Sequence, residues 1–500
     1  MQETLTKLAL DSLNEKFNLK HKDSILAFYK LRNGKAAWGN INNRVTLLNI
    51  IKESVLEGLT PSDYNVKQIE KVVTDSGADE KVNIISDLFL TDMYLEYAYH
   101  LGNGKISPKS LYNDWELTPN LFSYNEQLNI SLNENNINQS LDQIKPKEAL
   151  YKLLKKQLII AKESIFKDSL KTKIEHGDKI RPNKSDKRVI SIRKRLNELG
   201  FLNDSLVNKS ELLDTLLQES IESFQKHKQL KTDAIIGKGT VNALNKSYKD
   251  EYYSILANLE RFRWFPRNKG KEYIIVNVAD YNLTYVSPKD TTIHKVIVGR
   301  TDRKTPIFSS QINYLEFNPK WFIPPTIKNE DIIPAARKNS EYISNKNITV
   351  YNEKGNKVHP DSVNWNSAIV SNYRYVQSSG SSNALGRVKI IFPNKFSVYL
   401  HDTPSKSLFK KNYRARSSGC VRVENPFDLS AKLLREKEKY SRALIDTVIK
   451  KRHTLRVHLD KKVMAHFLYW TVIFNDNEQP IYINDVYNLD NQLAMKLLAN

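Results

Sequence analysis

The stretch Val398-Tyr-Leu-His-Asp-Thr-Pro404, followed by Ser417-Ser-Gly-Cys-Val-Arg-Val423, decides how the second half of this chain is interpreted. The first segment predicts a strand that ends at His401. The second predicts a glycine-containing turn that carries Cys420, just before a helix that begins near Pro426, because proline suits the first turn of a helix. Strand ends and sharp turns expose reactive side chains, so these two residues are candidates for one chemical site.

Cys420 is the one cysteine in 500 residues, which excludes an intramolecular disulfide and a multi-cysteine metal site. A thiol with an ordinary pKa of about 8.5 is mostly protonated at neutral pH, so a nucleophilic cysteine needs a nearby base or cation. His401 is the available base. Free cysteines are commonly buried as small hydrophobes, but the polar turn from Ser417 to Arg422 is unlike the apolar run around a core cysteine. A zinc site fits less well, because structural zinc takes several Cys or His ligands at short spacings.

After Glu251 the pattern of the chain changes to strands, which are rich in β-branched and aromatic residues and are bounded by Gly, Pro and Asn turns. Residues 327–384 interrupt the strands with Asn- and Ser-rich sequence that is too long for an ordinary loop, so we interpret them as an inserted lid or cap. The predicted strands are Tyr273–Val278, Asn282–Val286, His294–Val298, Ile307–Phe317, Val388–Phe392 and Phe396–His401.

Residues up to about 170 are predicted to be helical, and we find no catalytic constellation among them. One helix begins near Asn43 and stops at Gly58, whose missing Cβ suits a left-handed C-terminal cap. Another helix runs from about Lys81 to Leu101, before the turn Gly102-Asn103-Gly104. These apolar stripes form a core, so this part of the chain is predicted to be a scaffold.

A polar, basic stretch from about 166 to 187 is interpreted as a linker to a small module of three short helices. The module resembles the small helical peptidoglycan-binding domain over residues 185–248, and the resemblance does not identify ligand residues. A linker domain that packs and binds nothing is the alternative. The segments that carry the resemblance are R-L-N-E-L-G-F-L (Arg195–Leu202), S-F-Q-K-H (Ser223–His227) and G-K-G-T-V-N-A-L-N (Gly237–Asn245).

The formal net charge of +21 and the pI of about 9.5 suggest acidic partners: nucleic acid, an anionic membrane surface or a carboxylate-bearing polymer such as cell wall. Lysines and arginines are scattered through the chain, and no helix-turn-helix, zinc-finger or RNA-binding signature accompanies them, so we expect no nucleic-acid partner. The longest apolar run, near Ala465–Phe474, is too short to span a membrane.

The motif H-D-T-P (His401–Pro404), followed nineteen positions on (420 minus 401) by the cysteine of S-S-G-C-V-R-V, closely resembles the catalytic motif of L,D-transpeptidases of the large periplasmic type. The resemblance extends over nearly the whole chain. The other segments that resemble this family are A-N-L-E-R-F-R-W-F-P (Ala257–Pro266), V-G-R-T-D-R-K-T-P (Val298–Pro306), E-F-N-P-K-W (Glu316–Trp321), N-A-L-G-R-V-K (Asn383–Lys389) and F-L-Y-W-T (Phe467–Thr471).

The resemblance implies an α+β multidomain protein. Residues 1–170 are expected to form the helical scaffold, 185–248 the peptidoglycan-binding-like module, and 251–500 a mainly-β catalytic domain with the inserted capping subdomain 327–384. No cofactor or metal is implied. The substrate implies a periplasmic location, and since the N-terminus has no basic segment before an apolar core, we expect an export signal or anchor to have preceded residue 1.

The resemblance also implies the chemistry. Cys420 attacks the carbonyl of the third residue of a peptidoglycan tetrapeptide stem and releases the terminal D-alanine, while His401 takes the thiol proton. The backbone N–H groups of Gly419 and Cys420 are candidates for the oxyanion hole. An amine on a second stem then accepts the acyl group, which gives a 3-3 cross-link for cell-wall biogenesis and cell shape. β-Lactams of the carbapenem class are expected to acylate the same thiol.

Smaller members of the family carry histidine immediately before the Gly-Cys pair, where this chain has Ser418, so the group that orients His401 is unassigned. Arg422 could pair with a carboxylate of the stem or form a structural salt bridge. Tyr399 shares a strand face with His401 by the two-residue alternation. The residues predicted to contact substrate are Arg422, Ser418, Tyr399, Ser417, Asn383 and Arg387.

Two alternatives remain open from the sequence. If water outcompetes the acceptor amine, the same site makes an L,D-carboxypeptidase or a cross-link hydrolase. If the cysteine is inert, the chain is a wall-binding scaffold in which the helical module carries the function.

Overall fold

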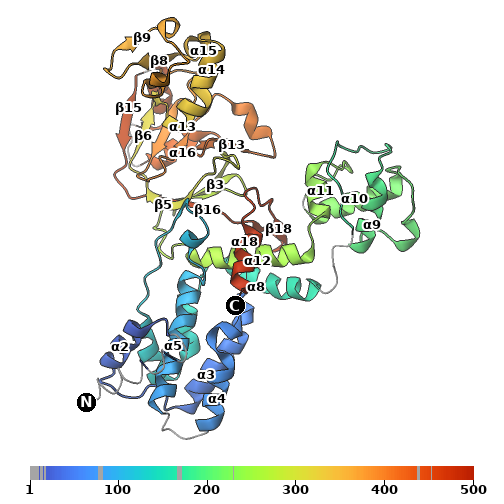
Figure 1. Cartoon of the computed structure of the whole chain (residues 1–500), viewed down its shortest axis with the longest axis vertical. Coiled ribbons are helices and arrows are strands. Elements are labelled where there is room, and N and C mark those ends of the chain that lie inside the picture. Colours follow the sequence, from blue (N-terminus) through green and yellow to red (C-terminus); the bar gives the residue numbers. More distant parts are fainter. Residues whose placement is uncertain are drawn as a thin grey trace. The chain divides into compact units, whose positions relative to one another are not determined.

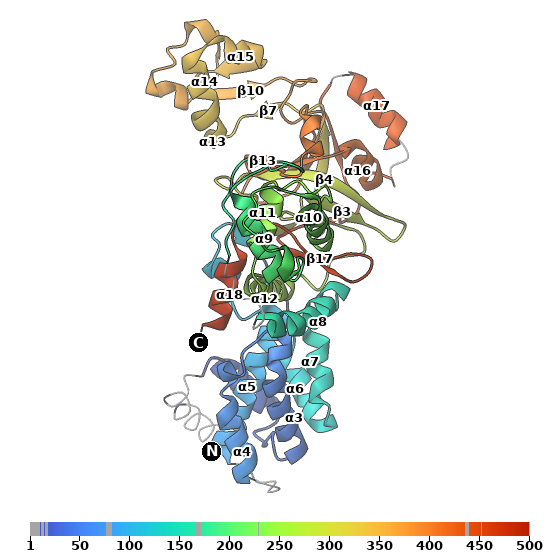
Figure 2. The same cartoon turned by 90° about the vertical axis from the view of Figure 1, so that its right-hand side faces the viewer.

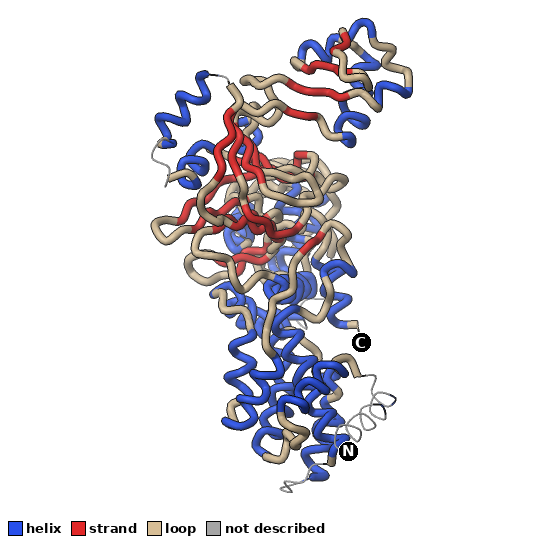
Figure 3. Tube along the Cα trace, turned by 90° about the vertical axis from the view of Figure 1, so that its left-hand side faces the viewer, coloured by secondary structure: helices blue, strands red, loops and turns tan. Residues whose placement is uncertain are grey.

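The computed structural model describes residues 11, 15, 19–76, 83–165, 172–228, 230–435, 440–451 and 453–499 (Figure 1). The chain divides into two compact units. The first consists of Met1–Leu111, Thr118–Arg267 and Trp470–Asn500, and the second of Tyr112–Leu117 and Asn268–Tyr469. The first unit is mainly helical, and the second contains the large β-sheet (Figure 3). The expected α+β architecture is therefore confirmed.

A bundle of helices forms the N-terminal part of the first unit (Figure 2). Helix α5 is buried along most of its length, because it is apolar on nearly every side and its neighbours cover it. The one acidic group of its first turn, Asp87, accepts hydrogen bonds from the backbone N–H of Trp38 at 2.7 Å and from the hydroxyl of Tyr29 at 2.6 Å. The helices are α2 (Lys22–Leu31), α3 (Ile41–Lys52), α4 (Val66–Ser76), α5 (Ile84–Asn103), α6 (Tyr124–Glu134), α7 (Ile137–Ile144) and α8 (Ala149–Ser164).

The predicted helix boundaries in this bundle are partly correct. Gly58 does adopt the left-handed conformation, with φ of +71°, but it ends a short 3-10 helix (Glu53–Glu57) that follows α3. The second predicted helix continues through Gly102, so the turn begins later than expected, at Gly104 with φ of +86°. Its predicted start at residue 81 and part of the predicted linker, residues 166–171, lie outside the described residues.

The three predicted helices of the small module are α9 (Arg188–Glu198), α10 (Thr215–His227) and α11 (Lys238–Leu244). Leu196 of α9, Phe224 of α10 and Leu244 of α11 are fully buried in one shared core. A buried guanidinium, that of Arg195, closes this core by donating to the carbonyl of Leu244 at 2.9 Å. The module therefore packs as its apolar pattern predicts.

The family-like segment Ala257–Pro266 lies mostly on α12 (Tyr248–Trp264), and its polar side chains serve packing in the first unit. Asn258 donates to the hydroxyl oxygen of Thr471 at 2.7 Å. Phe262 stacks on Trp470, with ring centroids 4.2 Å apart. The residues that make this segment recognisable therefore belong to a buried polar network and do not form a reactive site. The remaining elements here are β17 (Val472–Phe474), β18 (Pro480–Tyr482) and α18 (Asp490–Leu498).

The second unit is built on a sheet whose strand order is β1-β5-β16-β2-β3-β4-β14-β12-β11-β6-β15, with β13 paired to β4. Strands β14 and β12, which carry the decisive motifs, lie in the interior of this order. The strands are β1 (Trp115–Glu116), β2 (Tyr273–Asn277), β3 (Asn282–Val286), β4 (Thr291–Gly299), β5 (Ile307–Gln311), β6 (Tyr314–Phe317), β11 (Val388–Ile391), β12 (Leu400–His401), β13 (Ala415–Ser417), β14 (Val421–Val423), β15 (Leu455–His458) and β16 (Met464–Leu468).

The predicted strand Phe396–His401 is wrong over its first four residues. The side chain of Asn394 accepts from the backbone N–H of Phe396 at 3.1 Å and of Val398 at 2.9 Å, so these groups do not join a sheet ladder. Ser397 has a positive φ of 55°. Strand β12 is therefore short, and a side-chain-stabilised turn precedes it.

Residues of the predicted cap, 327–384, form a separate four-stranded sheet together with β7, which precedes the predicted boundary; its order is β7-β10-β8-β9, and it packs against short helices (Figure 3). Ile343, Val350 and Tyr375 are nearly fully buried in a hydrophobic core of its own. The elements are β7 (Trp321–Phe322), α13 (Pro325–Ile327), a π-helical turn (Lys328–Ile332), α14 (Ile333–Lys338), α15 (Glu341–Asn345), β8 (Ile348–Tyr351), β9 (Lys357–Val358) and β10 (Arg374–Gln377). Helices α16 (Pro426–Leu433) and α17 (Arg442–Lys451) follow β14.

Within the described ranges, no helix is both long and apolar enough to cross a membrane. The same residues contain no group of three or more His, Cys, Asp or Glu side chains placed to hold a metal ion.

Candidate active site

Three neighbouring strands bring the candidate residues together. Strand β12 pairs in parallel with β14, so that His401 stands opposite Arg422. On its other side β12 pairs antiparallel with β11, where Lys389 stands opposite His401. Cys420 immediately precedes β14, and the hydrogen bond from the Val421 N–H to the Tyr399 carbonyl, at 3.1 Å, holds the turn that carries Cys420 against β12.

The turn that carries the thiol is held by hydroxyl groups. The Ser417 hydroxyl donates to the carbonyl of Cys420 at 2.5 Å and accepts from the N–H of Gly419 at 3.3 Å. The Thr305 hydroxyl donates to the carbonyl of Gly419 at 2.8 Å. Gly419 has φ of +106°, a conformation that favours glycine. Ser417 is buried and its hydroxyl is engaged, so its place in the structure is that of a support for the turn.

Ser418, at the position where smaller relatives have histidine, accepts a hydrogen bond from Nη1 of Arg303 at 3.1 Å. The same guanidinium forms ion pairs with Asp331, at 2.6 Å, and with Glu330, both in the π-helical turn of the cap. Arg303 thus links the residue before the Gly-Cys pair to the cap. A π-helical turn of this kind is common near functional sites.

The Cys420 thiol is partly exposed and has an S–H donor contact to the carbonyl of Ser397, with sulfur and oxygen 3.8 Å apart. Burial raises the pKa of this thiol. Hydrogen bonding from Tyr399 and the charges of Lys389 and Arg422 lower the pKa, but these effects are smaller than that of burial. In this geometry the resting thiol is therefore protonated at neutral pH.

His401 is 5% exposed, and burial, together with the charges of Arg422 and Lys389, lowers its pKa to about 3. The imidazole is therefore neutral at neutral pH. Its Nδ1 lies 2.5 Å from the carbonyl oxygen of Asp402, which can only accept, so Nδ1 carries the proton and Nε2 is left as an acceptor. The backbone of Asp402 is the orienting group that the sequence left unassigned.

The described residues contain no direct hydrogen bond between Cys420 and His401. Contacts of this kind are often long in unliganded sites and tighten when substrate binds. In the structure the thiol is instead directed to the carbonyl of Ser397.

Two predicted substrate contacts have structural partners instead. Asn383 is fully buried, donates to the carbonyl of Ser378 at 2.9 Å and accepts from the N–H of Leu385 at 2.8 Å. Arg387 donates from Nη2 to the carbonyl of Ile449 at 3.0 Å. The structure does not bring either side chain to the thiol, because each is committed to a backbone group.

Arg422 differs from Asn383 and Arg387, because its buried Nε has no hydrogen-bond partner among the described residues. Its guanidinium is partly buried, and within the described ranges it forms no ion pair with a carboxylate. Its charge acts on both Cys420 and His401. The structural salt bridge that the sequence left open is absent from the part of the chain that the structure describes.

Lys389 and Trp321 were not singled out in the sequence, although both lie in family-like segments. The Lys389 Nζ lies 3.9 Å from the centroid of the Tyr399 ring. Burial raises the pKa of the Tyr399 phenol, and the nearby Trp321 indole opposes this shift to a smaller extent. Among the described residues, the Nε1–H of Trp321 meets no acceptor within hydrogen-bond geometry. Strand alternation predicts which face a residue occupies but not which strand lies beside it, so no sequence signal could have paired these side chains.

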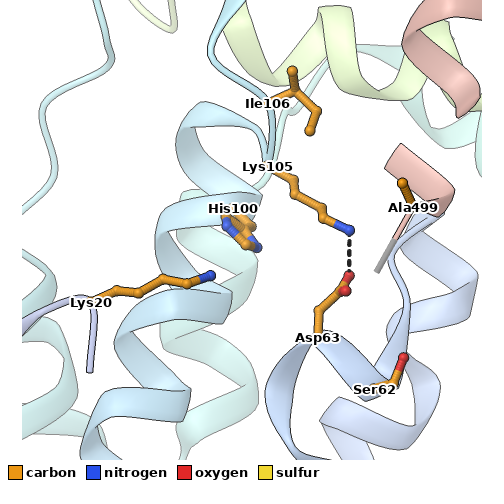
Figure 4. Close-up of a pocket in the computed structure, with 7 residues that line it drawn as sticks. All are labelled: Lys20, Ser62, Asp63, His100, Lys105, Ile106 and Ala499. Atoms are coloured by element: carbon orange, nitrogen blue, oxygen red, sulfur yellow. Dashed lines mark hydrogen bonds and ion pairs between the residues drawn. The ribbon is translucent and has the colours of Figure 1, made fainter. Parts of the chain in front are cut away.

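The first unit contains a pocket whose lining residues differ in kind from those of the candidate active site (Figure 4). In it, Lys105 pairs with Asp63 at 2.7 Å and donates to the carbonyl of Leu497 at 2.8 Å. Burial lowers the pKa of His100 to about 3, so its ring is neutral. Lys20, which also lines the pocket, pairs with Glu96 at 2.5 Å, so both lysines of the pocket have carboxylate partners.

Comparison with known families assigns the parts of the chain. Residues 23–158 match a family described as "Scaffold domain", residues 185–244 match "Putative peptidoglycan binding domain", and residues 271–448 match "L,D-transpeptidase catalytic domain".

A curated relative from Haemophilus influenzae, named "Putative L,D-transpeptidase", is 35% identical over 244 residues, which are 48% of this chain and 48% of the relative. The match thus spans about half the length of that relative.

Two solved structures are also similar. One is an L,D-transpeptidase from Xylanimonas cellulosilytica, with 13% identity and a TM-score of 0.18, over 60% of this chain and 100% of that one. The other, from Stackebrandtia nassauensis, has 12% identity and a TM-score of 0.18, over 59% of this chain and 96% of that one. These scores are too low to support an argument. The chain therefore contains, in order, regions that match a scaffold domain, a peptidoglycan-binding domain and an L,D-transpeptidase catalytic domain.

Proposed function

We propose that this chain forms 3-3 cross-links in peptidoglycan, with Cys420 as the nucleophile and His401 as its base. One observation carries the proposal. A neutral, buried imidazole, with its tautomer set by the Asp402 carbonyl, lies on the strand beside the chain's one cysteine. A neutral imidazole can accept the thiol proton, whereas a charged one could not.

In the first step Nε2 of His401 takes the thiol proton as the Cys420 sulfur attacks the carbonyl carbon of the third stem residue. The tetrahedral oxyanion is then stabilised by backbone N–H groups. The N–H of Cys420 is one candidate. That of Gly419 must first leave the hydroxyl of Ser417, to which it is bound at 3.3 Å. When the oxyanion collapses, the amide C–N bond breaks and the amine of D-alanine leaves with the proton from His401.

In the second step the amine of an acceptor stem attacks the Cys420 thioester. His401 takes a proton from this amine, a new amide bond forms, and the sulfur leaves as thiolate and is reprotonated. If water attacks instead, the product is a tripeptide stem, which corresponds to the carboxypeptidase or hydrolase alternative. The same residues serve both outcomes, so the geometry of the acceptor site decides between them.

The substrate we propose carries carboxylates, and Arg422 is the residue we expect to bind one of them. A partly buried guanidinium without an ionic partner is costly to desolvate, and an incoming carboxylate would restore the lost interactions. Tyr399 and Ser418 would line the same cleft, whereas Ser417, Asn383 and Arg387 would act through the backbone that they hold. We further propose that the protein works in the periplasm and that carbapenems acylate Cys420.

Arg422→Met is expected to lower kcat/KM for a tetrapeptide donor by about 10- to 100-fold, because charge-assisted hydrogen bonds contribute about 1.5–3 kcal/mol. The matched control is Arg416→Met, since Arg416 is exposed on the neighbouring β13 and donates to a backbone carbonyl, that of Tyr413, at 3.2 Å. Steady-state release of D-alanine measures both. An equal effect of the two substitutions would show that general positive charge, and not Arg422, binds the donor.

The test of the function is to incubate purified disaccharide-tetrapeptide with the protein and to identify the products by mass spectrometry. Dimers that have lost one D-alanine support the transpeptidase. Tripeptide monomers alone support the carboxypeptidase. If neither product forms, while the protein still sediments with peptidoglycan, the chain is a wall-binding scaffold and the proposal is wrong.

A further inference from the structure

Lys389 occupies an unusual position for a lysine. On β11 it stands opposite His401 of β12 on one side and opposite Glu316 of β6 on the other. Its ammonium group lies over the ring of Tyr399, 3.9 Å from the centroid. The side chain is partly buried, and within the described ranges it has no ion-pair partner.

Packing alone does not explain why a charged side chain occupies this position. Burial lowers its pKa, which is the usual effect of removing an ammonium from water. The carboxylate of Glu316 acts on this charge, but Glu316 is itself paired with Arg456, at 2.6 Å. A lysine that packed only its alkyl chain would extend its charge into water. Here the charge is held on an aromatic face beside the thiol.

The Tyr399 ring connects Lys389 to the nucleophile. The carbonyl of Tyr399 accepts a hydrogen bond from the N–H of Val421, the residue after Cys420, at 3.1 Å. Burial raises the pKa of the Tyr399 phenol, and the nearby Cys420 raises it further. A cation over an aromatic face is attracted to it and so favours one position of the ring. Lys389 therefore influences Cys420 in two ways. It fixes the orientation of the Tyr399 ring, and its positive charge acts directly on the sulfur.

We propose that Lys389 is a positioning residue for the nucleophile, which holds the Tyr399 ring against Cys420 and stabilises the thiolate that attacks the donor. This inference deepens the proposed function and rests on it. The ammonium favours the negative sulfur by Coulomb attraction, and its contact with the ring fixes the position of Tyr399, whose carbonyl holds the residue next to Cys420.

The other charged groups around the sulfur support this assignment. Arg422 on β14 is the second cation that acts on Cys420. Burial lowers the pKa of His401, and both cations lower it further. An imidazolium is therefore disfavoured at rest, so this site cannot rely on the thiolate–imidazolium pair that activates many cysteine nucleophiles. Of the two cations, Lys389 is the one in contact with Tyr399.

The test is the rate at which iodoacetamide alkylates Cys420 as a function of pH, in the full chain. Lys389→Met keeps the length of the side chain and removes its charge. We expect the apparent pKa of the thiol to rise by about one unit and the rate at pH 7 to fall about tenfold, because one pKa unit is a factor of ten in the thiolate population. Lys389→Arg keeps a cation that can stack on the ring, so it should restore most of the rate.

The matched control is Lys346→Met in the cap, where an exposed lysine lies 5.9 Å from the centroid of the Tyr342 ring. It should leave the pH profile unchanged. The proposal is overturned if Lys389→Met has the wild-type profile, or if Lys389→Arg is as slow as Lys389→Met while both keep the wild-type near-ultraviolet circular dichroism. Should the Met variant misfold, Lys389→Gln supplies the same comparison. Alkylation requires no peptidoglycan, so failure of the proposed function, seen in the product analysis, remains a separate outcome.

Discussion

Cys420→Ala is expected to lower the release of D-alanine from a tetrapeptide donor by about 10⁴-fold or more, since removing the nucleophile of a covalent mechanism has effects of this order. No other thiol can replace it, because the chain has one cysteine. The measurement is D-alanine release under saturating donor, together with the intact mass of the protein. The wild type should carry an acyl adduct with the mass of a tripeptide stem, and the variant should carry none.

The controls for Cys420→Ala are its free energy of unfolding and its sedimentation with peptidoglycan. Cys420 is partly exposed, so removing its sulfur should change the free energy of unfolding little, and sedimentation with peptidoglycan should not change. Activity retained in Cys420→Ala, at more than about a tenth of the wild-type rate, would exclude the cysteine as nucleophile, because general acid–base effects alone reach about 10²–10⁴-fold. Loss of activity together with loss of folding would be recognised from the thermal transition.

Glu260→Gln is expected to destabilise the first unit by about 3 kcal/mol, because it leaves a fully buried guanidinium without its carboxylate. Glu260 and Arg263 are both 0% exposed at the side chain and form an ion pair at 2.8 Å. The next carboxylate, Glu57, is already paired with Lys145 at 3.2 Å, so it cannot take over. Gln keeps the acceptor for the N–H of Ile106, which lies 2.7 Å from the Glu260 carboxylate, and so isolates the loss of charge.

Urea-induced unfolding, followed by far-ultraviolet circular dichroism, measures this effect. Glu478→Gln is the control, since Glu478 is 66% exposed and its pairing with Lys156 at 3.8 Å should contribute less than about 1 kcal/mol. Replacing both buried partners, as Glu260→Leu with Arg263→Met, should be less harmful than the single change, because no charge is then left uncompensated. A loss below about 1 kcal/mol for Glu260→Gln would show that water reaches the pair.

Local sequence was sufficient wherever the deciding interactions are local. The apolar faces of the small module predict its three helices, because residues three and four apart share a helix face whatever surrounds them. Gly58 predicts a left-handed cap for the same local reason, and its φ of +71° agrees. The failure at Phe396–His401 has a local cause as well, but one that strand propensity does not contain, since the side chain of Asn394 takes the N–H groups that a strand would have used.

The sequence by itself determined the two reactive residue types of the candidate site, because one thiol and a histidine at a strand end restrict the chemistry whatever the packing. Only the tertiary structure decided the surroundings that set their reactivity. The side chain of Asn383 is bonded to backbone groups, Arg422 has no ionic partner among the described residues, and Lys389 lies over Tyr399. Each of these facts depends on which strand lies beside which, and on how deeply each charge is removed from water. Both are set by contacts between residues far apart in the chain, which no local pattern records.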